Sequence, residues 1–138
     1  MKACVVDDDH TARILLGGYL EDRGWVAQLF NHPDTPSEEN KTLTEALSDR
    51  DTKLLIMDVR FGRDKEGLAK GPKTVEKLVN EGKLLSNCFV LFVSQFGKER
   101  IDFDSVEKAL NGKQITFDWL DKPIDFVLLN NILKKVGN

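Results

Sequence analysis

The chain has 138 residues, which fits one domain with a sizeable buried core. Hydrophobic residues make up 41% and charged residues 31%, as in ordinary globular proteins, and the formal net charge of -3 gives no basic face for nucleic acid. No apolar stretch has the length of a membrane span and the N-terminus carries no signal-like segment, so we expect a cytoplasmic protein that binds neither nucleic acid nor membrane. The two cysteines, Cys4 and Cys88, lie in apolar segments and are predicted to be buried free thiols.

The first part of the chain alternates apolar runs of strand length with segments of helical period, which is typical of βαβ units around a parallel sheet. Residues 3–7 are predicted to form a strand and residues 11–23 a helix, with Asp9 as the N-cap of that helix. A second strand is predicted over residues 25–30. The apolar positions of the first helix fall at helical spacing: Ile14, Leu15, Leu16, Tyr19 and Leu20.

A loop rich in turn formers, residues 31–36, follows the second strand. The second helix is predicted to begin with Thr35 as its cap, Pro36 at its first position and Glu38 completing a capping box. Residues 53–58 form a near-continuously apolar third strand, as expected at the centre of a sheet that is covered on both faces. The second helix is expected to place three residues inward: Leu43, Ala46 and Leu47.

A long, charged and glycine-containing loop is predicted over residues 60–71. Pro72 then begins a third helix that ends near Gly82. The fourth strand is predicted over residues 88–94, and residues 95–103 fit neither a helix nor a strand pattern clearly. The inward positions of the third helix are predicted to be Val75, Leu78 and Val79.

The last part of the chain is predicted to complete a (βα)₅ α/β fold in one domain, residues 1–138. Asp104 is the expected cap of a short helix that ends at Gly112, and residues 115–120 form the fifth strand. The closing helix covers residues 124–136. Its apolar stripe is expected to consist of Val127, Leu128, Leu129, Ile132 and Leu133.

Four of the predicted strands end in groups that suit phosphate or metal chemistry. Asp7 and Asp8 follow the first strand, Asp58 ends the third, Ser94 ends the fourth and Lys122 follows the fifth. Because the carboxyl ends of parallel strands share one edge of a sheet, we expect these groups to meet. The three carboxylates predict a site for Mg²⁺, which prefers hard oxygen ligands. Beside such an ion a carboxylate can become an aspartyl phosphate, while a hydroxyl and an ammonium bind the phosphoryl oxygens.

Four short motifs, in this order and spacing, resemble those of the receiver (CheY-like) domain of two-component response regulators: VVDD at residues 5–8, MD at 57–58, VS at 93–94 and KP at 122–123. The resemblance covers essentially the whole chain and implies a doubly wound, flavodoxin-like five-stranded parallel sheet of strand order 2-1-3-4-5. It implies a phosphorylation-controlled switch that is phosphorylated by a histidine kinase or a histidine phosphotransfer protein and acts on an unknown output partner. Such a domain is a regulator rather than an enzyme, although it catalyses its own phosphorylation and dephosphorylation.

The resemblance also implies roles for individual residues. Asp58 would be the phosphoacceptor, with Ser94 and Lys122 as the residues that bind its phosphoryl group. Ser94 and Trp119 would form the switch that responds to phosphorylation. The Mg²⁺ ligands would be Asp58 together with two carboxylates and one main-chain carbonyl, those of Asp7, Asp8 and Arg60.

Several segments depart from the pattern of that family. Residues 59–62 replace the usual Met-Pro after the phosphoacceptor, Gln95 stands where a small residue is usual, and Trp119 is larger than the usual switch aromatic. Gln95 either obstructs the water that would hydrolyse an aspartyl phosphate or orients it. Three loops are longer than in the family, and they are either functional or neutral insertions: residues 31–36, 60–71 and 95–103.

Two other functions fit part of the pattern. A degenerate receiver would bind partners without being phosphorylated, and Gln95 and the long loops leave that function open. A haloacid-dehalogenase-like phosphohydrolase would use Asp7 and Asp9 as its catalytic pair, with Ser94 in its second motif. That function leaves Asp58 unexplained, and the chain is short for that fold.

Overall fold

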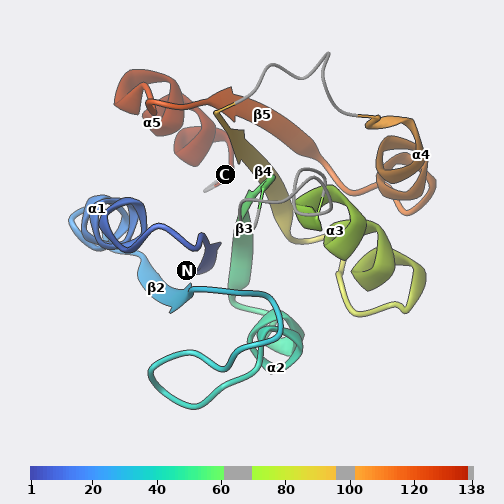
Figure 1. Cartoon of the computed structure of the whole chain (residues 1–138), viewed down its shortest axis with the longest axis horizontal. Helices are drawn as coiled ribbons and strands as arrows, with labels where there is room; N and C mark the ends of the chain where they lie inside the picture. The colour runs from blue at the N-terminus through green and yellow to red at the C-terminus, as the bar shows by residue number, and fades with distance from the viewer. Residues whose placement is uncertain (61–69, 96–101, 137–138) are drawn as a thin grey trace.

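A computed structural model of the chain describes residues 1–60, 70–95 and 102–136. Its strands form one sheet in the order β2-β1-β3-β4-β5, and every neighbouring pair is parallel, which confirms the predicted fold class and strand order (Figure 1). The strand bounds are Lys2–Val6 for β1, Val26–Phe30 for β2, Thr52–Asp58 for β3, Phe89–Ser94 for β4 and Phe117–Asp121 for β5.

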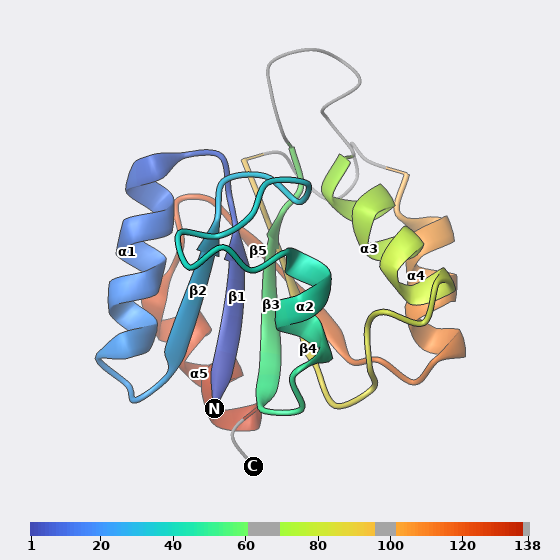
Figure 2. The same cartoon turned by 90° about the horizontal axis from the view of Figure 1, so that it is seen from below.

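Helices cover both faces of the sheet (Figure 2). One face packs against α1 (His10–Glu21) and α5 (Phe126–Val136), and their buried residues form one core cluster with that face. The other face packs against α2 (Leu43–Ser48), α3 (Lys70–Asn80) and α4 (Asp104–Gly112), which form the second cluster. A sheet between two helical layers must be apolar on both faces, which is why the central strands are continuously apolar.

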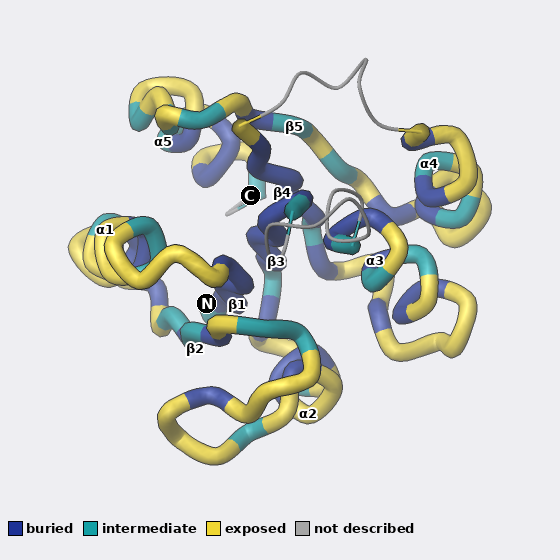
Figure 3. The backbone as a smooth tube through the Cα atoms, viewed as in Figure 1, coloured by how far each residue is buried: buried dark blue, intermediate teal, exposed yellow. Residues whose placement is uncertain are grey.

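The central strands β1, β3 and β4 are buried almost throughout, whereas the edge strands β2 and β5 and the outer faces of the helices are partly exposed (Figure 3). In the register of the sheet Val6 lies beside Met57, and Asp58 lies beside Val93. The side chains that follow these positions therefore meet at the carboxyl edge of the sheet, at the top of Figure 2. This edge carries the candidate site.

The predicted start of the second helix is wrong. The helix begins at Leu43, and its cap is Thr42, whose hydroxyl accepts a hydrogen bond from the Glu45 amide and donates one to the Glu45 carboxylate. Thr35 and Pro36 lie in the preceding loop. Two segments of this chain carry the capping pattern, and only the second is followed directly by a helix. The inward residues were predicted correctly, because Leu43, Ala46 and Leu47 are buried.

A turn explains why the earlier capping pattern is not used. The Ser37 amide donates to the Lys41 carbonyl, and the Lys41 amide donates to the Ser37 hydroxyl. Asn40 closes this turn with a φ of 62°, a conformation that cannot continue a right-handed helix. The turn therefore delays the helix until Thr42.

The predicted apolar stripe of α5 is wrong at two positions, and α1 also exposes two of its apolar residues. Ile14 and Leu15 are 51% and 57% exposed, and Val127 and Leu128 are 70% and 49% exposed. A helix at the flank of a sheet buries a stripe little wider than 100°, so some of its apolar positions face outward. The stripes that are buried consist of Leu16 and Leu20 in α1, and of Leu129, Ile132 and Leu133 in α5.

The remaining elements agree with the predictions apart from their ends. The helix α3 begins at Lys70 rather than Pro72, and its predicted inward residues are buried. Asp104 is the first residue of α4 rather than its cap, which is Phe103 without a side-chain hydrogen bond. Most of the predicted long loops, residues 61–69 and 96–101, lie outside the described residues.

Both cysteines are buried and free, as predicted. Burial raises the pKa of Cys4 and of Cys88 to about 12, so both are protonated thiols at neutral pH. In the described part of the chain, none of the helices combines the length and the apolar character that a membrane crossing requires.

Candidate functional site

The carboxyl edge of the sheet brings together the polar groups that end the central strands. Asp7 follows β1, Asp58 ends β3 and Ser94 ends β4, and these side chains are almost fully buried. Asp8, by contrast, is exposed. A cluster of buried polar residues at one edge of an otherwise apolar sheet is a feature that packing alone does not require.

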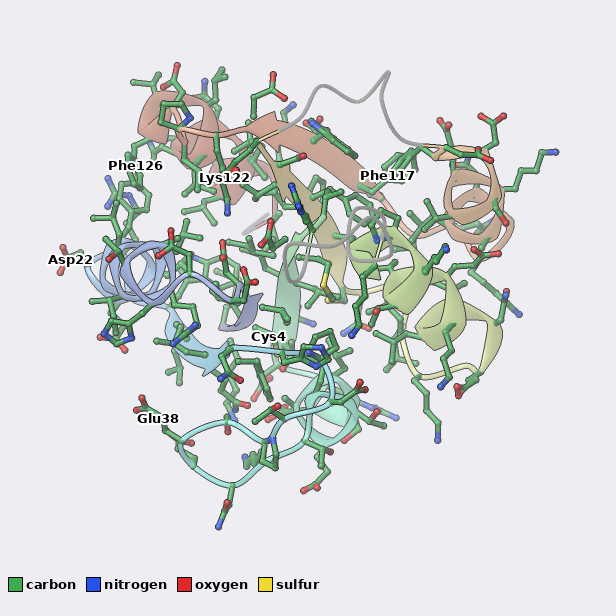
Figure 4. The ribbon with its side chains drawn as sticks, in the orientation of Figure 1. Cys4, Asp22, Glu38, Phe117, Lys122 and Phe126 are labelled. Carbon is green, nitrogen blue, oxygen red and sulfur yellow. The ribbon has the colours of Figure 1, made fainter. Side chains whose placement is uncertain are left out.

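Lys122 links two of the carboxylates. Its Nζ atom lies 2.9 Å from Asp7 Oδ2 and 3.5 Å from Asp58 Oδ1. The lysine comes directly after β5, where the chain turns toward α5 (Figure 4), and its amide donates to the Ser94 carbonyl over 2.7 Å. That main-chain bond fixes the start of the lysine side chain against the end of β4, so the ammonium group reaches across the sheet to the two aspartates.

The acidic group suits a hard divalent cation. Asp7, Asp8 and Asp58 each offer one carboxylate oxygen, and these atoms lie within 4.8 Å of one another. All three donors are oxygens, and the exposure of Asp8 leaves room for water on the open side. Mg²⁺ takes oxygen ligands and keeps part of its water shell, so this donor set fits it.

Burial makes the charge on Asp58 costly. Its own burial and then the neighbouring carboxylate of Asp7 raise the pKa of Asp58 to about 8, although Lys122 acts in the opposite direction. Burial by itself lowers the pKa of Lys122, but the attraction of Asp58 and Asp7 outweighs it and the pKa of the lysine is raised. The two aspartates therefore share the ammonium of Lys122, and a bound cation would stabilise the ionised form of Asp58.

The turn between β1 and α1 fixes the orientation of Asp7. The Asp9 amide donates to Asp7 Oδ1, and the Arg13 guanidinium donates to the Asp7 carbonyl over 2.8 Å. Asp9 itself caps α1, as predicted, by accepting from the Thr11 and Ala12 amides. Its carboxylate thus caps the helix and is not a member of the acidic group formed by Asp7, Asp8 and Asp58.

The other residues with expected roles lie around this group. Ser94 is 1% exposed at the end of β4, and Arg60 follows β3 by two residues. Trp119 lies on β5, where its ring packs against Phe103 at 5.4 Å between centroids and its Nε1 atom donates to Asp121. The tryptophan thus belongs to the layer under α4 rather than to the acidic group itself.

Three residues at this edge were missed by the sequence analysis. Arg13 holds the Asp7 carbonyl, and Lys70 Nζ lies 2.8 Å from His32 Nε2, which joins the start of α3 to the loop after β2. Nothing in the sequence pairs residues 38 positions apart. Gly71, at the start of α3, contacts the main chain of Asp58. A glycine in the first turn of a helix carries no pattern that would have revealed this contact.

Comparison with known proteins agrees with this geometry. No protein-family model matches the sequence, and no curated protein matches it. Among solved structures, a response regulator receiver protein from Pseudoalteromonas atlantica is similar over 100% of this chain and 98% of its own, with a TM-score of 0.70 at 16% identity. The chain has the fold of a receiver domain.

Other solved structures with the receiver fold cover the chain in the same way. A two-component response regulator from Clostridium difficile matches 99% of this chain and 94% of its own, with a TM-score of 0.63 and 19% identity. The chemotaxis protein CheY4 from Vibrio cholerae matches 98% of this chain and 97% of its own, with a TM-score of 0.62 and 19% identity. The TM-scores over nearly the whole chain show the receiver fold, and at such low identities the chemistry has to be argued from the residues of the site.

Proposed function

We propose that residues 1–138 form a single receiver domain, a cytoplasmic switch that accepts a phosphoryl group on Asp58. The observation that carries the proposal is the environment of that carboxylate. Asp58 is buried at the end of the central strand, 3.5 Å from the Lys122 ammonium and grouped with Asp7 and Asp8. A structural role alone would not favour a buried carboxylate with a pKa raised to about 8.

The donor in this proposal is a phosphohistidine of a histidine kinase or a histidine phosphotransfer protein. A carboxylate oxygen of Asp58 forms a bond to phosphorus while the bond from phosphorus to the histidine nitrogen breaks, and the imidazole leaves. Lys122 is close enough to hold a phosphoryl oxygen after the transfer. The hydroxyl of Ser94 provides a further hydrogen bond to those oxygens in the phosphorylated state.

Asp7, Asp8 and Asp58 would hold Mg²⁺, together with the main-chain carbonyl of Arg60. The ion, when bound, supplies positive charge between the carboxylates and the incoming phosphoryl group. Asp8 is exposed and lies on the open side of the group, so it provides the entry for the ion. The domain remains a regulator that promotes its own phosphorylation and dephosphorylation, with an output partner that is still to be identified.

Intact mass spectrometry tests the proposal. Incubation with acetyl phosphate and Mg²⁺ should add one phosphoryl group to the parent and none to Asp58→Asn. Asp51→Asn is the matched control, because Asp51 is exposed at the opposite edge of the sheet and should leave the labelling unchanged. Label that persists in Asp58→Asn would place the acceptor elsewhere. No label in the parent with any phosphodonor would favour a degenerate receiver.

The switch part of the proposal has its own test. Trp25 belongs to the core cluster under α1 and α5, whereas Trp119 packs against the cluster on the other face. If Ser94 and Trp119 respond to the phosphoryl group, beryllofluoride should change the tryptophan fluorescence of Trp25→Phe as it does in the parent. A change that disappears with Trp25 would contradict the role of Trp119.

A further inference from the structure

The first turn of α3 lies directly against the main chain of Asp58. Gly71 is buried there, and a Cβ atom at this position would collide with the Asp58 carbonyl oxygen and lie 2.9 Å from the Val59 Cα atom. Real Cβ atoms do not come within 3.0 Å of such neighbours. Both neighbours are main-chain atoms, so neither can move aside by changing a side-chain rotamer. Only a glycine permits this approach of helix and strand.

The same contact holds the peptide that follows Asp58. The Gly71 amide donates to the Val59 carbonyl over 2.9 Å, and the Val59 amide donates to the Val93 carbonyl over 3.0 Å. Val59 is fully buried. The main chain just beyond the acceptor is thus held by α3 on one side and by β4 on the other.

Packing in the core opposes a shift of α3 away from the end of β3. Val75 and Val79 anchor α3 in the core with almost no exposure, and the Thr74 hydroxyl donates to the Lys70 carbonyl within the first turn. Lys70 also contacts His32 in the loop after β2. A side chain at position 71 would therefore displace the main chain of Asp58 and Val59 rather than the whole helix.

We propose that Gly71 is a positioning residue for the phosphorylation of Asp58, an inference that rests on the proposed function. Its missing side chain lets α3 fix the main chain from Asp58 to Val59. That segment sets the direction of the Asp58 carboxylate and leads into Arg60, whose carbonyl is an expected metal ligand. Gly71 is not among the residues that would hold Mg²⁺ or the phosphoryl group, so it would act through the main chain at the end of β3.

The geometry required for the transfer makes the effect large. Displacement of a reacting group by about 1 Å lowers the rate of a positioned reaction about 100-fold. Mg²⁺ tolerates little distortion of its octahedral ligand set, so the same displacement also weakens metal binding. Gly71→Ala should therefore lower both Mg²⁺ affinity and phosphorylation by more than its loss of stability explains.

Three variants separate positioning from general destabilisation. Gly71→Ala adds the clashing methyl group. Gly112→Ala is the matched control, since a Cβ at the end of α4 meets nothing within 4 Å. Leu129→Ala lowers stability from the fully buried core of the opposite face. Mg²⁺ affinity is measured by calorimetry and acetyl-phosphate labelling by mass spectrometry, at a temperature where circular dichroism shows all proteins to be folded.

The expected result is a Mg²⁺ dissociation constant about tenfold higher and a labelling rate at saturating Mg²⁺ at least about tenfold lower in Gly71→Ala alone. Affinity and rate in Gly71→Ala equal to those in Leu129→Ala would overturn the inference and leave the proposed function intact. A Gly71→Ala protein that never folds would make the contact a requirement of the fold and would also overturn it. A parent that neither binds Mg²⁺ nor accepts phosphate would overturn the proposed function, and the inference with it.

Discussion

Each edge of the sheet carries a lysine–aspartate ion pair, and the two pairs differ in their surroundings. At the amino edge Lys2 and Asp49 lie 2.6 Å apart, with about 30% of each side chain exposed. At the carboxyl edge Lys122 and Asp7 lie 2.9 Å apart, with 15% and 2% exposed. The shorter pair is the one that water and salt screen, and exposed pairs of this kind contribute little to stability.

At the carboxyl edge the numbers of positive and negative groups are not equal. Lys122 serves Asp7 and Asp58 together, and burial raises the pKa of Asp58 to about 8. At the amino edge the ion pair lies open to water, whereas at the carboxyl edge one ammonium group faces two buried carboxylates, which costs stability. This difference is what the proposed function would require of the carboxyl edge, and four substitutions test the comparison of the two edges.

The largest effect is expected for Lys122→Met without divalent cations. Removal of one partner leaves the buried carboxylates uncompensated and should lower the free energy of unfolding by roughly 3 kcal/mol at pH 8. At pH 5 Asp58 is protonated, because its pKa is raised to about 8, and the loss should be smaller. Urea denaturation at the two pH values measures the difference. Equal losses at both would show that the lysine stabilises the fold by packing rather than by charge.

Asp58→Asn is expected to stabilise the protein. The pKa of Asp58 in the folded state, about 8, lies above its ordinary value of 3.8, so between these pH values the folded protein binds more protons than the unfolded chain. The free energy of unfolding therefore falls as pH rises through this window. Asp58→Asn has no carboxylate to ionise at this position. Its free energy of unfolding should therefore exceed that of the parent by about 2 kcal/mol at pH 8 and by almost nothing at pH 4.

Urea denaturation of Asp58→Asn across that pH range, in buffer without divalent cations, provides the measurement. Asp51→Asn is the control at the other edge, where the side chain is exposed. A gain in the free energy of unfolding of Asp58→Asn that does not change with pH would mean that ionisation of the Asp58 carboxylate does not destabilise the fold.

The N-cap of α2 lies away from both ion pairs, and its removal shows how much an ordinary polar contact contributes to the free energy of unfolding. Thr42→Ala removes the hydroxyl that caps α2 and should lower the free energy of unfolding by about 1 kcal/mol, independent of salt. Thr35→Ala, in the loop where the sequence pattern predicts the cap, should leave stability unchanged. Thermal denaturation of the two variants compares them directly, and a larger loss for Thr35→Ala would restore the predicted helix start.

The smallest effect is expected for Lys2→Met. The pair with Asp49 is short but solvent-screened, so the urea midpoint should remain within experimental error of the parent at 0.15 M salt. A loss of stability in Lys2→Met as large as that in Lys122→Met would show that the exposed and the buried ion pair contribute equally. Any small loss that is seen should shrink further as salt is added.

The order of elements could be predicted from the sequence because each depends on a local pattern. The strands β1, β3 and β4 are short apolar runs, and the α1 cap at Asp9 is a local hydrogen-bond motif. The strand order came from the resemblance to receiver domains, and the sheet confirms it. Asp7 and Asp58 lie in one acidic group, as their strand-end positions predict, while their roles in phosphorylation stay predictions. The α2 start was missed because the turn around Asn40 depends on contacts within the loop.

By itself the sequence determined which residues end strands, and parallel strands with shared carboxyl ends leave those residues at one edge. Only the tertiary structure decided which apolar residues of α1 and α5 face outward, since exposure depends on how each helix lies on the sheet. The tertiary structure likewise decided that Lys122 reaches both Asp7 and Asp58, and that Gly71 meets the main chain of Asp58. Close approach between residues far apart in the chain is a property of packed elements, and no local pattern encodes it.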